Sequence, residues 1–359
     1  MEIATSDISI SVTLALISRK SLKISSSEIR PGESRWREYM GIVQRLSLGL
    51  EMKEKIGELV VEPGVLRGGV DRVVCRINTI PEVLEYLLLL AGFCRVPWRL
   101  TLEGCTNSGR GAGISIDLIK SVYCKILGQF GLTVEIKIVK RAIYPAVDGE
   151  VLLLVDAVSS LKPVCWTRRE ELERMVSVNY SARLGSDVLH RITNCHRDAL
   201  KSITSRVKVY NDIGNRTNSS GTPGYGTLLL AMGKNSVYFA EYTVDGTDSL
   251  LHKTPEERSA VAIKELLRSI RRSGAYDYKV ESFVFSLLPL TSPDVSSVLI
   301  RPVSQAGKDR LWLLEKILKY TYTIEKYQRS EAEINAGVSE QLFLLKSYGV
   351  GYTNIYQPQ

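Results

Sequence analysis

The sequence predicts a mixed α/β (α+β) protein, and three observations indicate this fold class. Segments with helical periodicity alternate with segments of strand periodicity along the chain. The order of helix end, polar break and short strand recurs at intervals of roughly 80 residues or more, which predicts repeated helix-and-strand units. A chain of 359 residues that is 44% hydrophobic and 24% charged is typical of a globular protein. This composition excludes a collagen-like chain and a mostly disordered one.

The first half of the chain contains the clearest elements. Apolar residues at helical spacing predict helices over 39–50, 84–91 and 119–130. Alternation over 134–138 predicts a strand, and the apolar run 149–155, later in the chain, predicts a more buried strand.

Residues 179–274 have the pattern of one complete small unit. A helix over 189–203 is followed by a strand over 206–212, a turn-rich segment, and a hairpin formed by 227–233 and 236–244. A last helix begins with a capping box, in which Thr254 is the N-cap and Glu257 is at N3. The third repeat continues only after this unit. We therefore predict a large domain of residues 1–178 and 275–328, interrupted by an inserted domain of residues 179–274.

The C-terminal tail, residues 329–359, is predicted to form an amphipathic helix. Its apolar residues follow helical spacing at Ile334, Val338, Leu342 and Leu345.

No targeting or metal signal is present in the sequence. No stretch approaches the roughly 18 unbroken apolar residues of a spanning helix, and the N-terminus does not resemble a secretory signal. None of the six cysteines forms a CxxC pair, so we expect reduced thiols in a cytosolic or nuclear protein and no zinc site. His190 and His196 lie on different faces of a predicted helix, where His196 is expected in the core, and His252 is expected in a solvated loop.

The basic excess is moderate, with a formal net charge of +8. Basic residues gather in three groups, and such groups are either solvated faces or phosphate contacts along an RNA path. The members are Arg30, Arg35 and Arg37, then Arg67 and Arg72, then Lys137, Lys140 and Arg141. Trp36 and Tyr39 beside the first group fit base stacking or the core equally well.

The glycine-rich segment 106–117 opens the helix over 119–130. Backbone amides at a helix N-terminus can bind an anion, and Arg110 within the segment favours phosphate. The segment is neither a Walker loop nor a GxGxxG motif. The simpler alternative is a strand-to-helix connection with Ser115 as the N-cap. No triad and no carboxylate cluster indicates a catalytic site.

Several segments together resemble the RNA 3′-terminal phosphate cyclase family, and most closely its eukaryotic cyclase-like branch. They are LTLEGCTNSGRGAGISIDLIK, VEIKIVKRAIYPAVDGEVLLLV, SVNYSARL, GTPGYG, DVSSVLIRPVS and LLEKILKYTYTIEK, and the resemblance runs over roughly 9–326. It implies a large domain of three repeated two-helix, four-strand units, with a small α/β domain inserted in the third.

Departures from the family pattern bear on activity. The glycine-rich segment near the N-terminus of cyclases is replaced here by SDISISVTLALIS, and a later PGLRPQHL element is reduced to PGESRWREY. The family's adenylated histidine aligns with Ala306, and no histidine follows His252. Because alanine cannot attack a phosphate, the resemblance implies no cyclase activity, no catalytic residue, no metal and no cofactor.

The cyclase-like branch implies a ribosome-biogenesis factor of the small-subunit processome, needed for 18S pre-rRNA processing in the nucleolus. Our leading hypothesis is a nuclear, non-cyclase scaffold. We expect it to bind a ribosome-biogenesis GTPase and pre-rRNA with its small nucleolar ribonucleoprotein, and we expect no binding to a membrane. Its former active-site groove would keep anion-binding residues, namely Arg30, Arg35, Arg67, Thr106, Asn107, Arg110, Lys140 and Arg141. The alternatives are an endoribonuclease that cleaves pre-rRNA, an ATP-dependent RNA 3′-terminal phosphate cyclase, and a purely protein-binding adaptor.

Overall fold

A computed structural model describes most of the chain, namely residues 1–109, 113–215, 217–219, 221–245, 253–329, 331, 341–354 and 356. Four of the residues discussed above lie outside this described part: Arg110, His252, Ile334 and Val338.

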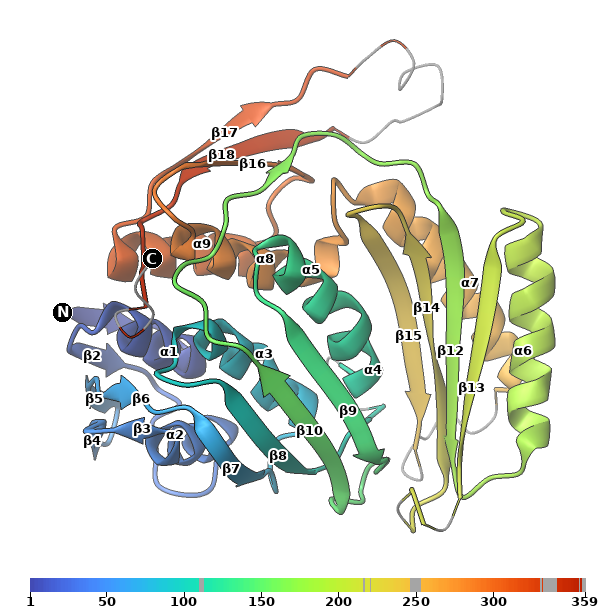
Figure 1. Cartoon of the computed structure of the whole chain (residues 1–359), viewed down its shortest axis with the longest axis horizontal. Coiled ribbons are helices and arrows are strands. Elements are labelled where there is room, and N and C mark those ends of the chain that lie inside the picture. The colour runs from blue at the N-terminus through green and yellow to red at the C-terminus, as the bar shows by residue number, and fades with distance from the viewer. Residues whose placement is uncertain are drawn as a thin grey trace.

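Three four-stranded sheets share one topology (Figure 1). In each sheet, the first two strands of the unit in chain order are parallel to each other. The last two strands form an antiparallel hairpin, and the final strand of this hairpin also pairs with the second strand of the unit. The chain order in each unit is strand, helix, strand, helix, strand, strand. This repetition confirms the fold that the sequence and the resemblance predicted.

The first unit has the strand order β1-β2-β5-β4. Its elements are β1 (Glu2–Ala4), α1 (Ile8–Ser18), β2 (Leu22–Ser25), α2 (Arg35–Arg45), β4 (Glu51–Lys55) and β5 (Glu58–Glu62). A small pair, β3 (Ser47–Leu48) and β6 (Val65–Leu66), lies beside it.

The second unit has the order β7-β8-β10-β9. Its elements are β7 (Gly69–Val74), α3 (Ile80–Leu90), β8 (Trp98–Gly104), α4 (Ile116–Leu118), the π-helical turn η2 (Ile119–Tyr123), α5 (Cys124–Gln129), β9 (Val134–Lys140) and β10 (Gly149–Val155). The third unit, of order β11-β16-β18-β17, contains β11 (Cys165–Trp166), α8 (Glu281–Leu287), β16 (Val295–Ile300), α9 (Gln305–Leu318), β17 (Tyr322–Lys326) and β18 (Phe343–Tyr348).

The inserted unit lies in the chain between β11 and α8, within the third repeat. It consists of β12 (Arg174–Ala182), α6 (Ser186–Lys201), β13 (Val207–Gly214), β14 (Gly224–Met232), β15 (Val237–Val244) and α7 (Pro255–Arg272), with strand order β13-β12-β14-β15. The capping box of Thr254 and Glu257 is present. Strand β12 begins at Arg174, ahead of the boundary predicted at 179. The domain boundaries themselves stay a prediction.

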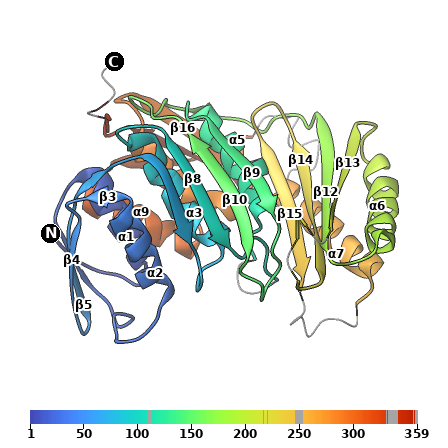
Figure 2. The ribbon, with the colours of Figure 1, turned by 60° about the horizontal axis from the view of Figure 1, so that its bottom comes forward.

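The helices of the three repeats lie between the sheets. Helix α1 contacts α2, α3 and α9, and α8 contacts α3 and α9. Figure 1 shows α8 and α9 beneath the third sheet, and Figure 2 shows α3 behind the second sheet. Helix α1 is therefore buried on all sides, and its polar Thr13 is satisfied by the hydroxyl of Tyr39 at 2.7 Å. This burial explains why SDISISVTLALIS is so apolar.

The inserted sheet is covered on both faces, which explains why β14 and β15 are buried along most of their length. On one face, Leu229 and Ala231 pack with Leu266 of α7. On the other face, Leu228 and Leu230 join the main hydrophobic core. His196 is buried, with Nδ1 2.9 Å from the Ser177 hydroxyl, so it is a core histidine as predicted.

The helix predicted for the C-terminal tail is wrong over Phe343–Tyr348, which form β18 between β16 and β17. Leu345 is fully buried there, whereas Tyr348 is 52% exposed. The apolar residues fit both periodicities. The strand forms because it supplies the antiparallel partner that β16 and β17 both need, and tertiary pairing overrides local preference.

Candidate functional site

The predicted anion-binding residues lie in two separate places. Arg30, Arg35 and Arg67 belong to the first repeat, around α2 and β6. Thr106, Asn107, Lys140 and Arg141 lie where the second repeat meets the inserted sheet. Within the described residues, no hydrogen bond or ion pair joins the two groups. Their sharing of a single groove stays a prediction.

Arg141 joins two units of the fold. It is 3% exposed, and its guanidinium donates to Asp117 at 2.6 Å and to Asp212 at 2.7 Å. It also lies 4.4 Å from the ring centre of Tyr180. Burial alone would raise the pKa of Asp117, but Arg141 holds that pKa below its ordinary value. Asp117 belongs to α4 and Asp212 to β13, so two carboxylates from different units of the chain bind Arg141. The contact of Arg141 with RNA phosphate stays a prediction.

The neighbouring predicted residues are also engaged. Thr106 and Asn107 are fully buried: the Thr106 hydroxyl donates to the Ala142 carbonyl at 2.9 Å, and the Asn107 amide donates to Asp117 at 3.1 Å. Lys140 pairs with Asp148 at 2.6 Å. Thr106 and Asn107 therefore help to position the Arg141 cluster, and their role in anion binding stays a prediction.

Ala306 lies in the first turn of α9 and is exposed, so this turn presents only a methyl group at that position. The N-cap Ser304 donates its hydroxyl to Glu281 at 2.6 Å and its backbone N–H to the same oxygen at 3.1 Å. A Cβ at Gly307 would lie 2.2 Å from that carboxylate. Burial raises the pKa of Glu281. A helix N-terminus favours an anion, and here the chain's own Glu281 occupies that place.

Carboxylates of the chain also occupy other groups of N–H and O–H donors that could bind an anion. Glu38 accepts three consecutive backbone N–H groups, from Arg76 to Asn78, at 2.5–2.9 Å. In the glycine-rich segment, Gly109 donates its N–H to Asp245 at 3.0 Å. Ser115 caps α4 and donates its hydroxyl to Glu241 at 2.5 Å. The described part of the segment thus favours the simpler alternative of a connection capped by Ser115.

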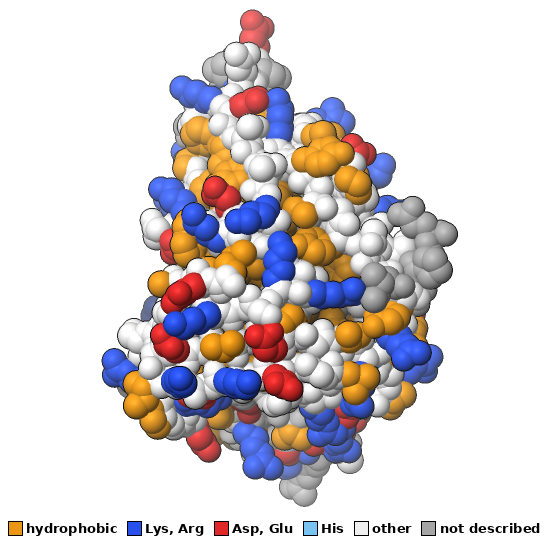
Figure 3. Space-filling model, turned by 90° about the vertical axis from the view of Figure 1, so that its left-hand side faces the viewer, with side chains coloured by type: hydrophobic (Ala, Val, Ile, Leu, Met, Phe, Trp, Pro, Cys, Tyr) orange, Lys and Arg blue, Asp and Glu red, His pale blue; other side chains and the backbone are white. Residues whose placement is uncertain are grey.

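The first-repeat arginines stay on the surface. Arg30 and Arg67 are exposed, and Arg35 pairs with Glu82 at 2.8 Å. Trp36 is 6% exposed and Tyr39 1%, so both belong to the core and are not available to stack on bases. Figure 3, which faces the left side of Figure 1, shows basic and acidic side chains interspersed on this face.

Sequence reasoning missed a polar cluster where all three repeats meet. Arg310 of α9 donates to Asp7, ahead of α1, at 2.9 Å and to Ser286 of α8 at 2.7 Å. Nearby, Glu85 of α3 accepts the Tyr123 hydroxyl at 3.0 Å, and burial raises the pKa of Glu85 while Arg310 opposes the rise. The available signal was Glu85 itself, a carboxylate within the apolar run of α3.

Comparisons with known proteins agree with this architecture. The family model described as RNA 3′-terminal phosphate cyclase matches residues 8–324. The chain is 28% identical over 355 residues to the RNA 3′-terminal phosphate cyclase-like protein of Mus musculus, covering 96% of this chain and 94% of that protein. It is 24% identical over 355 residues to the rRNA processing protein RCL1 of Saccharomyces cerevisiae, covering 96% and 93%. The rRNA processing protein rcl1 of Schizosaccharomyces pombe is 24% identical over 328 residues, covering 88% and 85%. With three repeats of one topology and a family match over most of its length, the chain belongs to the RNA 3′-terminal phosphate cyclase family.

Proposed function

We propose that this chain is a nuclear rRNA-processing factor that lacks cyclase activity and acts as a scaffold for 18S pre-rRNA maturation in the small-subunit processome of the nucleolus. The names of the two yeast relatives support rRNA processing, and the name of the mouse relative supports a cyclase-like protein. A ribosome-biogenesis GTPase and pre-rRNA with its small nucleolar ribonucleoprotein are the proposed partners.

The observation that carries the non-cyclase proposal is the N-terminus of α9. Nucleophilic catalysis needs a side chain that attacks phosphorus, and Ala306 has none. Glu281 caps the same helix end through Ser304, so a second negative group there would be repelled. These two features support the proposal that this turn supplies neither a nucleophile nor an open anion site.

Incubation of the purified protein with ATP and a 3′-phosphorylated RNA tests the proposal. We expect neither a cyclic phosphate end nor a protein–AMP adduct, with a histidine-containing cyclase as the positive control. The A306H variant restores a nucleophile but leaves Glu281 in place, and it is expected to stay inactive. A wild-type adduct would refute the proposal. Activity of A306H alone would show that the cap at Glu281 does not close the site.

The proposed GTPase surface is an apolar groove between α9 and the β17–β18 hairpin. The groove encloses about 440 Å³ and is lined by Val303, Leu311, Trp312, Ile324 and Phe343, among others. Trp312 is 40% exposed and Ile324 39%, which leaves apolar area for a partner to cover. The W312E variant should lose the GTPase on co-purification from cell extract, and V70E, at an exposed position of β7, should keep it. Equal retention by both variants would exclude this groove.

The endoribonuclease alternative gains no support from the described residues. Asp117 and Asp212 both bind Arg141, and Glu281 caps α9, so these carboxylates are engaged and do not converge on a shared metal or water site. Purified protein that cleaves a pre-rRNA spacer would revive that alternative.

A further inference from the structure

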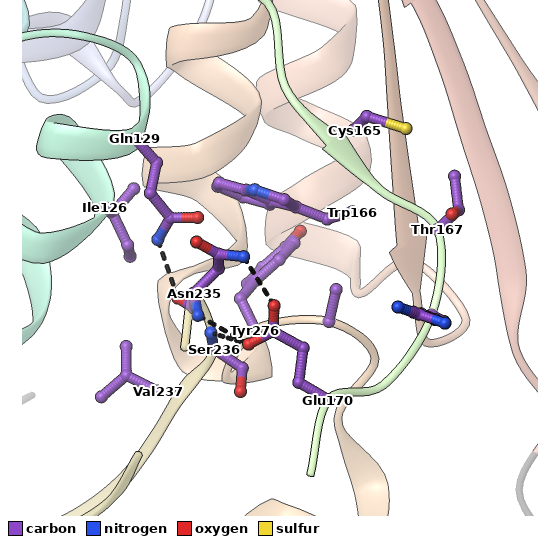
Figure 4. Close-up of a pocket in the computed structure, with 12 residues that line it drawn as sticks. Ile126, Gln129, Cys165, Trp166, Thr167, Glu170, Asn235, Ser236, Val237 and Tyr276 are labelled. Carbon is purple, nitrogen blue, oxygen red and sulfur yellow. Dashed lines mark hydrogen bonds between the residues drawn. The ribbon is translucent and has the colours of Figure 1, made fainter. Parts of the chain in front are cut away.

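A cavity that the proposed function does not use lies between the second repeat, the third repeat and the inserted unit. It encloses about 170 Å³. Its walls come from α5, from β11 with the segment that follows it, from the β14–β15 turn, and from residues 275–276 (Figure 4). Pockets that enclose drug-sized ligands measure about 300–1,000 Å³, so this cavity suits a single ring system with the rest of the ligand outside.

Trp166 forms one wall of the cavity. Its ring contacts Phe130 at 5.6 Å and Tyr276 at 6.0 Å between ring centres, both nearly edge-on, and these contacts fix the indole in place. Trp166 is half-buried, and Figure 4 shows its ring across the top of the cavity, above the amides of Gln129 and Asn235. An indole held in this way offers a planar surface on which a base can stack.

The opposite wall carries an unused hydrogen-bond acceptor. The Gln129 side-chain N–H donates to the Asn235 carbonyl at 2.7 Å, and its oxygen Oε1 is buried without a hydrogen-bond partner among the described residues. A buried acceptor without a partner costs free energy, and an N–H group of a ligand would satisfy it.

The turn on this wall is held rigidly. Glu170 accepts the backbone N–H groups of Asn235 and Ser236 at 2.6 and 2.9 Å, and Lys125 donates to the Gly233 carbonyl at 2.8 Å. Burial lowers the pKa of Lys125. Since the turn is already ordered, a ligand would not have to order it on binding.

The rim of the cavity is positively charged. Arg168 is exposed, and its side chain has no hydrogen-bond or ion-pair partner within the described residues. The inserted unit beside it, residues 174–274, has 15 lysines and arginines against 9 aspartates and glutamates, which is +6 of the chain's net +8. A free guanidinium next to a stacking ring is suited to a phosphate attached to a base.

We propose that this cavity binds one unpaired nucleotide of a single-stranded RNA, with the base on Trp166, a base N–H on Gln129 and the adjoining phosphate on Arg168. This inference rests on the proposed contact with pre-rRNA and names a place for it, on a different part of the molecule from Ala306. A free mononucleotide has the same chemistry, so the experiment separates the two sources.

Fluorescence anisotropy of the full chain with a labelled single-stranded oligoribonucleotide tests the pocket, with unlabelled mononucleotides as competitors. W166A should weaken RNA binding roughly fivefold or more, because stacking on an aromatic ring contributes about that much per base. W166F should retain most of the affinity, and Y348A, which removes an exposed aromatic ring of β18, should bind like wild type. R168E should reduce the slope of log affinity against log salt by about 0.7, the value for one phosphate contact on a single strand. If W166A does not fold, R168E carries the test, since Arg168 is exposed.

The outcomes separate this inference from the proposed function. If wild type binds RNA and both W166A and R168E bind it equally well, the pocket is excluded while the proposed RNA contact stands. If wild type binds no single-stranded RNA, both are overturned. If mononucleotides bind at Trp166 and RNA does not, the RNA assignment is wrong and the pocket belongs to a free nucleotide.

Discussion

At the scale of single residues, arginines that look alike in the sequence have opposite environments. Arg141 is buried against Asp117 and Asp212, whereas Arg168 is exposed at the rim of a cavity. A guanidinium that already binds two carboxylates holds two segments of the fold together. One without a carboxylate partner is available to a phosphate. The environment therefore decides which arginine can bind a ligand.

Removing Arg141 tests its structural role. R141A should destabilise the protein by about 3–5 kcal/mol, because it leaves the buried carboxylate of Asp117 without its partner. D212N should lower the free energy of unfolding by less than R141A does. The side chain of Asp212 is 48% exposed, and Arg141 would still be paired with Asp117. Urea unfolding of the two variants measures this difference. Equal losses of unfolding free energy in the two variants would contradict the role of Arg141 in holding α4 and β13 together.

At the scale of elements, the contact between α4 and β15 depends on a buried carboxyl group. Burial raises the pKa of Glu241 to about 8, although the Ser115 hydroxyl that bonds to it opposes the rise. The unfolded carboxyl titrates near 4.3, so between these two values the folded protein binds more protons than the unfolded chain. Stability should therefore fall as the pH rises from about 4.3 to about 8 and level off above it.

The E241Q variant imitates the protonated carboxyl and should remove this dependence. Its melting temperature relative to wild type should rise from pH 5 to pH 9. E135Q, at an exposed position of β9, should show a constant difference over the same range. A constant difference for E241Q as well would mean that Glu241 does not titrate in this interval.

Strand β18 provides a second test at the element scale. L345A should cost about 2–5 kcal/mol, because it removes a fully buried side chain between β16 and β17. Y348A should change the free energy of unfolding by no more than about 0.5 kcal/mol, since that side chain is 52% exposed. Denaturant unfolding compares the two. Similar small losses would argue against the strand and favour a tail that is loosely attached.

At the scale of the whole molecule, positive charge is concentrated in the inserted unit, and the first repeat carries interspersed charges. RNA affinity depends on neutralised phosphates, so the location of the charge predicts the location of the contact. The double variant K234E/R272E should lower the salt dependence of RNA binding more than R30E/R67E, as measured by anisotropy at several salt concentrations. A larger effect of R30E/R67E would return the RNA path to the first repeat, and little binding by wild type would favour the protein-binding adaptor.

The sequence by itself determined the repeats, the inserted unit and most of its elements. Local signals sufficed for these: the apolar stripe from Ile119 to Phe130, the alternation from Val134 to Ile138 and the capping box at Thr254 depend on neighbours in the chain. The resemblance identified the family, because it follows from the order of the residues. The alignment of Ala306 with the family's histidine stays a prediction.

Only the tertiary structure decided which charges are free. Arg141 meets Asp212, and Glu281 meets Ser304, across distances in the chain that no periodicity encodes. The structure also decided that Phe343–Tyr348 form a strand, because this segment pairs with β16 on one side and with β17 on the other. It brought Trp166, Gln129 and Asn235 together from three units. Burial and pairing between distant segments fix the energy of a charge, and these are properties of the folded chain.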